Sequence, residues 1–466
     1  MVKIKFGTDG WRAIIADEYT VDNVRRVSTG TALWMQGQNM KQVVIGHDCR
    51  FGGEMFLKAS TEVFSAHGIK VWYAQDFVST PMVSLGVVKL GADLGIVITA
   101  SHNPPSYNGF KLKSKFGGPS IPAEIAAVEA LIPNTNIDIT TFKSFDQLVS
   151  EGLAEMAPLE DMYVAHAEAG FDLNKIRSSG IRIAYDAMYG AGQRAMLRLL
   201  PDAVALHCDY NPSFKGQAPE PIGKNLKEFA ELIRREGNIG LGIANDGDAD
   251  RIGLFDSKGE FVDSHHILLL LLYYLHHYKG ESGDVVVSFS VSEKLKNLAD
   301  QYGLQTEITK IGFKYIAEIM TQRDVLVAGE ESGGLAVKGH IPERDGIWIG
   351  LMIAEFMATT GKSLEQLISE VYALVGSFWY DRDDLHITES LKQSIISKCT
   401  NDEFKSFGDE TITSIQSIDG FKFFLGEGRW IMIRPSGTEP VLRVYAQGRD
   451  KADTRHLLEQ VKNTIL

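Results

Sequence analysis

The chain has 466 residues, about three times the ~150 of a typical single domain, so several domains are expected. Hydrophobic residues make up 44% and charged residues 23%, a globular composition that excludes disorder and fibrous repeats. The net charge of −13 disfavours broad binding to nucleic acid or to an anionic membrane, and we expect neither partner.

Short apolar runs alternate with helical patterns through the first three-quarters of the chain. Strands are predicted at 43–45, 69–73, 94–99, 181–185, 239–244, 284–289 and 325–328. Helices are predicted at 55–66, 82–90, 226–235, 293–302, 347–357 and 364–375. Buried strands that alternate with helices are typical of a mostly parallel α/β sheet.

The pattern changes after Gly376. Strands are predicted at 420–425, 430–434 and 441–446, and a helix at 452–465. We therefore predict three mixed α/β domains and a C-terminal α+β domain. Their expected limits are 1–145, 146–256, 257–372 and 373–466.

Three observations bear on the compartment. Cys49, Cys208 and Cys399 lie far apart without a paired spacing, which indicates free thiols in a reducing environment. The start of the chain has no apolar segment of signal-peptide length, and the longest apolar run is too short to span a bilayer. We expect a soluble, cytoplasmic protein.

His265 and His266 are interpreted as surface or interface residues.

The first candidate loop is TASHNP, Thr99 to Pro104, directly after a predicted strand. Ligands of α/β proteins bind at the carboxyl ends of strands, where Ser101 would offer a hydroxyl. Ser101 and His102 are not expected to form a catalytic pair, because neighbours in an extended loop point apart. A simple turn closed by Asn103 and Pro104 is the alternative.

The second loop is DGDADR, which places Asp246, Asp248 and Asp250 after a predicted strand and ends in Arg251. Three alternating carboxylates repel one another unless a cation lies among them, and oxygen ligands beside a phosphate suit Mg²⁺. An EF-hand is excluded, because Arg251 and Ser257 occupy its glycine and glutamate positions. A solvated acidic turn is the alternative.

The third loop is GEESGG, 329–334, in which Glu330 and Ser332 could bind sugar hydroxyls. Glycines there would let the backbone approach a ligand closely. A flexible turn explains this loop equally well.

The fourth loop is RPSGTEP, 434–440. Arg434, Ser436, Thr438 and the backbone around Gly437 could form a concave site for a phosphate dianion. The loop has no Walker lysine, which favours a sugar phosphate over a nucleotide. A hairpin turn with a solvated arginine is the alternative.

Together with the opening FGTDGWR, Phe6 to Arg12, these four motifs in this order resemble the α-D-phosphohexomutases, the family of phosphoglucomutases and phosphomannomutases. The resemblance implies four domains around a central cleft, the last one similar to the TATA-box-binding protein. It also implies that Ser101 carries a phosphoryl group and that hexose 1-phosphate and hexose 6-phosphate interconvert through a hexose 1,6-bisphosphate.

The resemblance implies a role for each matching residue. The Mg²⁺ ligands would be Ser101 (through its phosphate), Asp246, Asp248 and Asp250. The groups beside the transferring phosphate would be Arg12, Arg251 and Lys111, the last assisting proton transfer. The sugar would be bound by Glu330, Ser332 and the loop that begins at Lys310. The non-reacting phosphate would be held by Arg434, Ser436, Gly437 and Thr438.

Two departures stand out: Gly334 and Phe313 replace histidines found in some members of the family, which argues against histidine-based proton transfer. GEESGG favours the phosphoglucomutase branch, with mannose or dual specificity as the alternative. A phosphatase with Asp246 as nucleophile and a non-catalytic phosphosugar-binding protein also remain open. The partner is expected to be a small phosphosugar, and the protein a monomer or dimer.

Overall fold

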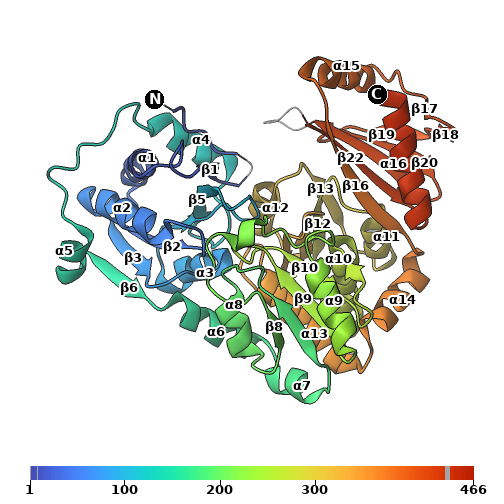
Figure 1. Cartoon of the computed structure of the whole chain (residues 1–466), viewed down its shortest axis with the longest axis horizontal. Coiled ribbons are helices and arrows are strands. Elements are labelled where there is room, and N and C mark those ends of the chain that lie inside the picture. The colour runs from blue at the N-terminus through green and yellow to red at the C-terminus, as the bar shows by residue number, and fades with distance from the viewer. Residues whose placement is uncertain (1, 8, 436–440) are drawn as a thin grey trace. The chain divides into compact units, whose positions relative to one another are not determined.

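The computed structural model (Figure 1) describes residues 2–7, 9–435 and 441–466. The chain divides into two compact units. Unit 1 contains the described residues up to Asp284 together with Gly312–Leu367, and unit 2 contains Val285–Ile311 and those of Ile368–Leu466. No helix in the described ranges is long and apolar enough to cross a membrane.

The first sheet of unit 1 has six strands in the order β1-β5-β4-β2-β3-β6. Its strands are β1 (Trp11–Ile14), β2 (Gln42–His47), β3 (Lys70–Ala74), β4 (Leu94–Ile98), β5 (Tyr107–Ser114) and β6 (Ala154–Ala157). β2 pairs in parallel with β3 and β4, whereas β5 is antiparallel to β1 and β4. Every residue of β4 is buried, which explains its unbroken apolar run.

Six helices accompany this sheet (Figure 1): α1 (Val21–Gly37), α2 (Gly53–Ala66), α3 (Thr80–Leu90), α4 (Pro122–Leu131), α5 (Phe145–Ser150) and α6 (Leu159–Gly170). Side-chain caps start several of them. Thr20 accepts a hydrogen bond from the Asn23 amide at the start of α1, and Ser79 caps α3 in the same way. α3 ends at Gly91, whose φ of 63° suits a helix C-cap.

The second sheet has the order β11-β10-β9-β7-β8. Its strands are β7 (Ile183–Asp186), β8 (Val204–Leu206), β9 (Leu241–Asn245), β10 (Ile252–Phe255) and β11 (Phe261–Val262). The helices along this stretch are α7 (Leu173–Ser178), α8 (Gln193–Leu199), the short η1 (Phe214–Gly216) and α9 (Lys227–Glu236). β9 and β10 form an antiparallel hairpin, and its loop is the acidic motif 246–251.

The rest of unit 1 contains the third loop, GEESGG at 329–334, which is called the sugar-loop motif below. Its elements are α10 (Ser264–Leu272), η2 (Tyr273–Tyr278), α12 (Phe313–Met320), β14 (Val325–Gly329), β15 (Leu335–Val337) and α13 (Gly346–Thr360). Glu330 and Ser332 lie in the turn between antiparallel β14 and β15. The interpretation of His265 as a surface residue is wrong, because only 1% of it is exposed in the first turn of α10.

Unit 2 contains the antiparallel sheet β16-β22-β21-β20-β19. Its strands are β16 (Trp379–His386), β19 (Ser414–Gln416), β20 (Phe421–Gly426), β21 (Arg429–Pro435) and β22 (Val441–Gly448). Figure 1 shows α15 (Glu389–Thr400) and α16 (Lys451–Ile465) beside this sheet, and their apolar side chains share its core. The other elements are β12 (Asp284–Ser288), α11 (Glu293–Gln301), β13 (Thr306–Thr309), β17 (Ser406–Phe407), β18 (Glu410–Thr411) and α14 (Leu364–Val375), which begins in unit 1. The predicted class, mixed α/β with a β-rich C-terminal region, is confirmed.

Candidate active site

Ser101 follows β4 and is completely buried. Its φ of 53° lies in the left-handed region, and its Oγ donates a hydrogen bond to Asp246 Oδ2 at 2.7 Å. The expectation that Ser101 and His102 point apart is wrong, since the serine backbone is not extended and Oγ lies 3.4 Å from His102 Nδ1. Burial, followed by the charges of Arg251 and Arg12, holds the pKa of His102 well below its usual range. His102 is therefore neutral beside the serine.

The acidic loop lies directly against the serine loop. Asp246, Asp248 and Asp250 are wholly buried, and one oxygen from each lies within 4.8 Å of the others. The approach requires glycine at position 247, because a Cβ there would lie 2.6 Å from the carbonyl oxygen of Ser101. The two predicted loops thus meet backbone to backbone.

Asp248 and Asp250 each have one carboxylate oxygen held by protein groups, whereas both oxygens of Asp246 accept hydrogen bonds. Asp248 Oδ2 accepts from Thr80 Oγ1 at 2.5 Å and from Lys111 Nζ at 2.8 Å. Asp250 Oδ2 lies 3.1 Å from Lys111 Nζ and 2.8 Å from Arg344 Nη2. The Oδ1 atoms of Asp248 and Asp250 are buried and have no hydrogen-bond partner among the described residues. Two such oxygens beside a third carboxylate fit a hard divalent cation.

The electrostatics of the loop lead to the same conclusion. Burial, reinforced by the charges of Asp248 and Asp250, raises the pKa of Asp246 well above its usual range. Burial also disfavours the charged form of Asp248, but the Lys111 ammonium outweighs it and the pKa of Asp248 is lowered. The carboxylates repel one another, so a cation among them would be stabilising.

Lys111 lies in β5, is 1% exposed and also contacts Asp9 Oδ2 at 2.8 Å. Burial opposes its charge, yet the charges of Asp248, Asp250 and Asp9 raise the pKa of Lys111 above its usual value. A lysine with a raised pKa keeps its proton. In this state Lys111 is a fixed positive charge.

Two predicted arginines lie at the same place. Arg12, in β1, donates to Asn103 Oδ1 at 2.6 Å, within the serine loop. The backbone amide of Arg251 donates to Asp246 Oδ1 at 3.0 Å. The side-chain Nε of Arg251 is buried and has no partner among the described residues. Arg12 is thus bonded to the serine loop and Arg251 to the acidic loop that contacts Ser101.

Arg344 belongs to this cluster but was not predicted. Its guanidinium contacts Asp9 Oδ2 at 2.6 Å and Asp250 Oδ2 at 2.8 Å, and lies 5.3 Å from the centre of the Phe313 ring. The signal in the sequence is only the charged run before α13, which reads as an ordinary helix start. Its carboxylate partners lie far from it in the chain.

The sugar-loop motif places a further buried acid, Glu330, near Arg344 and Arg251. Glu330 is 5% exposed and its Oε1 accepts from the Gly312 amide at 2.8 Å. Burial raises the pKa of Glu330, although the charges of Arg344 and Arg251 oppose the shift. Ser332 lies in the same turn and is partly exposed.

The remaining predicted residues belong to unit 2. Arg434 and Arg443 face each other on antiparallel β21 and β22, and the buried Nε of each has no partner among the described residues. Arg434 Nη2 contacts Asp419 Oδ2 at 3.3 Å. Lys310 is exposed in the loop after β13. Ser436, Gly437 and Thr438 lie outside the described residues.

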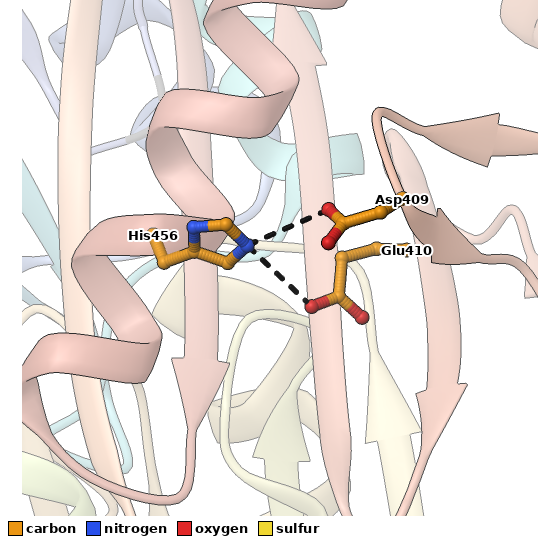
Figure 2. Close-up of side chains that lie close together, drawn as sticks. All are labelled: Asp409, Glu410 and His456. Atoms are coloured by element: carbon orange, nitrogen blue, oxygen red, sulfur yellow. Dashed lines mark ion pairs between the residues drawn. The ribbon is translucent and has the colours of Figure 1, made fainter.

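A second group with potential metal ligands consists of Asp409, Glu410 and His456, which approach one another in unit 2 (Figure 2). His456 Nε2 lies 3.6 Å from Asp409 Oδ1 and 3.9 Å from Glu410 Oε1. Arg429 already pairs with both oxygens of Glu410. This group is partly exposed, and one of its three members is already paired with an arginine.

Comparison with known proteins gives the family. Four models of phosphoglucomutase/phosphomannomutase domains match the chain: the alpha/beta/alpha domains I, II and III at residues 3–137, 161–259 and 263–375, and the C-terminal domain at 396–464. The match follows the order of the predicted motifs.

Individual relatives carry several substrate names. A phosphoglucomutase/phosphomannomutase of Thermococcus kodakarensis is 28% identical, with 97% of this chain and 96% of that protein aligned. A phosphoglucosamine mutase of Methanococcus maripaludis is 30% identical over 97% and 96% of the two chains. A crystal structure from Thermus thermophilus, provisionally named a phosphomannomutase, is 32% identical with a TM-score of 0.87 and covers 100% of this chain and 99% of that one. The chain therefore belongs to the α-D-phosphohexomutase family and is a phosphohexomutase, an isomerase that transfers a phosphoryl group.

Proposed function

We propose that this phosphohexomutase interconverts hexose 1-phosphate and hexose 6-phosphate, with Ser101 as the phosphate carrier and Mg²⁺ as the cofactor. The observation that carries the proposal is the hydrogen bond from Ser101 Oγ to Asp246, beside the partnerless Oδ1 atoms of Asp248 and Asp250. A nucleophilic hydroxyl and a hard-cation site are the two parts that phosphoryl transfer requires. Mg²⁺ held by these carboxylates would offset the charge on the phosphate oxygens.

In the proposed reaction, phosphorylated Ser101 meets a hexose 1-phosphate. The free sugar hydroxyl forms a new O–P bond while the Oγ–P bond breaks, and in the net balance the hydroxyl proton ends on Ser101 Oγ. The product is a hexose 1,6-bisphosphate. After it turns end for end, its other phosphate returns to Ser101 and the second hexose phosphate leaves.

The surrounding cations have distinct parts in this proposal. Lys111 anchors one oxygen of Asp248 and of Asp250 and keeps their other oxygens oriented toward the cation. Arg12 and Arg251 supply positive charge to the equatorial phosphate oxygens, where charge develops in the transition state.

The proposed substrate contacts are divided between sugar and phosphate. Glu330 and Ser332 would bind sugar hydroxyls. Arg434 would bind the non-reacting phosphate together with Ser436, Gly437 and Thr438, and Lys310 would border the sugar. The support is that Arg434 and Arg443 are cross-strand neighbours, each with a buried Nε that has no partner among the described residues, and two adjacent guanidinium groups suit a phosphate.

Glucose is the proposed hexose, because the sugar-loop motif GEESGG favours the phosphoglucomutase branch. Glucosamine is the second candidate, favoured by relatives named phosphoglucosamine mutase at up to 30% identity. Mannose follows from the combined name of the Thermococcus relative. The oligomeric state, monomer or dimer, and the four domain limits stay predictions.

The test has two parts. Intact-mass analysis of the purified protein, followed by peptide mapping, should find one phosphate, on Ser101, and Ser101→Ala should abolish turnover while retaining substrate binding. The 1-phosphates of glucose, glucosamine and mannose are then assayed together for 6-phosphate and inorganic phosphate. Release of inorganic phosphate alone would indicate a phosphatase, and ligand binding without turnover would indicate a phosphosugar-binding protein. Normal turnover by Ser101→Ala would remove Ser101 from the mechanism.

A further inference from the structure

The backbone of Ser101 is held on both sides by buried side chains, Thr99 at the start of the serine loop and Arg50 outside every predicted motif. A φ of 53° is uncommon for a residue other than glycine and persists only where the surroundings fix it. The peptide groups before and after Ser101 both have side-chain partners, one from Thr99 within the loop and one from Arg50 outside it.

Arg50 holds the carbonyl side. It follows β2 and is 1% exposed. Its Nη2 donates to the carbonyl oxygens of Ser101 and Asn103, each at 2.6 Å. Its Nη1 donates to those of Pro104 at 2.8 Å and Tyr107 at 3.0 Å. One guanidinium therefore ties together three carbonyls of the serine loop and one at the start of β5, a task that its planar, multi-donor geometry permits.

Thr99 and Asp48 hold the amide side. The Ser101 amide donates to Thr99 Oγ1 at 2.9 Å, and that hydroxyl donates to Asp48 Oδ2 at 2.5 Å. Asp48 also accepts from the Arg50 amide at 2.9 Å and lies 3.3 Å from Arg50 Nε. All three side chains are almost fully buried. The two halves of the network thus meet at one carboxylate.

We propose that Asp48, Thr99 and Arg50 form a clamp that positions Ser101 for phosphoryl transfer, an inference that rests on the proposed function. The serine must present Oγ at the same place in its free and its phosphorylated form, because it both gives and regains the phosphate. A displacement of about 1 Å in a reacting atom lowers the rate by about 100-fold. The three residues are positioning residues, since they touch the backbone around the nucleophile and not the reacting atoms.

The first test is Thr99→Val, which keeps the shape of the side chain and removes the hydroxyl. We expect kcat to fall roughly 10- to 100-fold with KM changed by less than about threefold. Thr99→Ser should restore most of kcat. The matched control is Thr31→Val, since Thr31 is also fully buried and its hydroxyl donates to Val27 O in its own helix. A kcat for Thr99→Val equal to that of Thr31→Val would overturn the clamp.

A second variant keeps the test decisive if Thr99→Val does not fold. Arg50→Lys retains the positive charge beside Asp48, but an ammonium cannot reach four carbonyls at once. We expect a folded protein whose single-turnover rate of Ser101 phosphorylation by hexose 1,6-bisphosphate is at least about 10-fold slower than wild type. An unchanged rate would overturn the clamp.

The proposed function and the clamp fail in different ways. An active wild-type protein that carries no phosphate on Ser101, or an active Ser101→Ala variant, overturns the proposed function and the clamp with it. A phosphorylated wild type, an inactive Ser101→Ala and a fully active Thr99→Val would overturn the clamp alone.

Discussion

Gly334 and Arg344 are interlocked: a Cβ on residue 334 would lie 2.4 Å from Cδ of Arg344. The arginine passes through the space that the glycine leaves, and it reaches Asp9 and Asp250 from there. Its guanidinium also lies against the ring of Phe313. The two positions at which this chain departs from the histidines of some family members thus both adjoin Arg344. Gly334 and Phe313 therefore both shape the space that the Arg344 side chain occupies.

Gly334→Ala should therefore displace Arg344. The clash involves Cγ and Cδ of the arginine, at 3.0 and 2.4 Å, which cannot move without shifting the guanidinium. We expect kcat to fall roughly 10-fold, and the loss to be non-additive with that of Arg344→Ala in a double-mutant cycle. Gly37→Ala, at a position where a Cβ would contact nothing within 4 Å, is the control. Fully additive losses would show that the two residues act separately.

Asp248→Asn should weaken the response to Mg²⁺. The substitution removes the negative charge behind one of the two partnerless oxygens, so the concentration of Mg²⁺ at half-maximal activity should rise by about 10-fold or more. Titration of activity with Mg²⁺ gives this value directly. Asp409→Asn, in the ion-pair cluster of unit 2, should leave the titration unchanged. An unaltered profile for Asp248→Asn would contradict the metal assignment.

Arg434→Ala should mainly affect substrate binding. Loss of one phosphate-binding guanidinium is worth about 1.5–3 kcal/mol, which corresponds to a KM roughly 10- to 100-fold higher for every hexose phosphate tested. Arg449→Ala, at a side chain that is 62% exposed, is the control. Steady-state kinetics separate the two effects. A loss confined to kcat would indicate that Arg434 does not bind the substrate phosphate.

Lys113→Met should destabilise unit 1. Lys113 Nζ contacts Glu343 Oε2 at 2.5 Å, and both side chains are wholly buried. Removing one member of a buried ion pair costs about 3–5 kcal/mol, of which Arg344, 3.5 Å from the other oxygen of Glu343, should offset a part. Lys58→Met removes the exposed partner of Glu54 and should change stability by less than about 0.5 kcal/mol. Urea unfolding of both variants measures the difference, and equal losses would contradict the prediction.

His207 should make stability depend on pH. Burial opposes its charged form, but Asp186 at 3.0 Å and Glu228 at 3.3 Å outweigh burial and raise the pKa of His207 above 6.5. The stabilisation is therefore fully present below the unfolded value of about 6.5 and is lost as pH rises through the folded value. The difference in unfolding free energy between wild type and His207→Gln should be larger at pH 6 than at pH 9.

Much of the fold follows from local patterns. The predicted strands 43–45, 94–99 and 239–244 correspond to β2, β4 and β9, and the predicted helix 364–375 matches α14. The apolar pattern of the sequence predicts such elements because the side chains that they bury are apolar. β5 was missed because Lys111 and Lys113 are buried in it, and their counter-charges come from residues more than 100 positions away. α1 was missed for a similar reason, since Asn23, Arg26 and Ser28 lie on its buried face.

The residues of the candidate site also fall into those that local sequence predicted and those that it did not. The serine and acidic loops are continuous in sequence, so their chemistry could be predicted from neighbouring residues. Arg50 and Arg344 could not be found, because each is an ordinary charged residue until folding brings its partners to it. The roles of these residues depend on charged partners that lie far away in the chain, and a short sequence motif does not contain such partners.

The left-handed φ of Ser101 limits which alcohol-bearing amino acid can serve there. Threonine carries the same functional group, but its branched Cβ makes a positive φ a strained outlier. A phosphothreonine carrier, or a serine-to-threonine exchange during divergence, would add strain to this backbone. The geometry of one dihedral angle thus favours serine over threonine at this position.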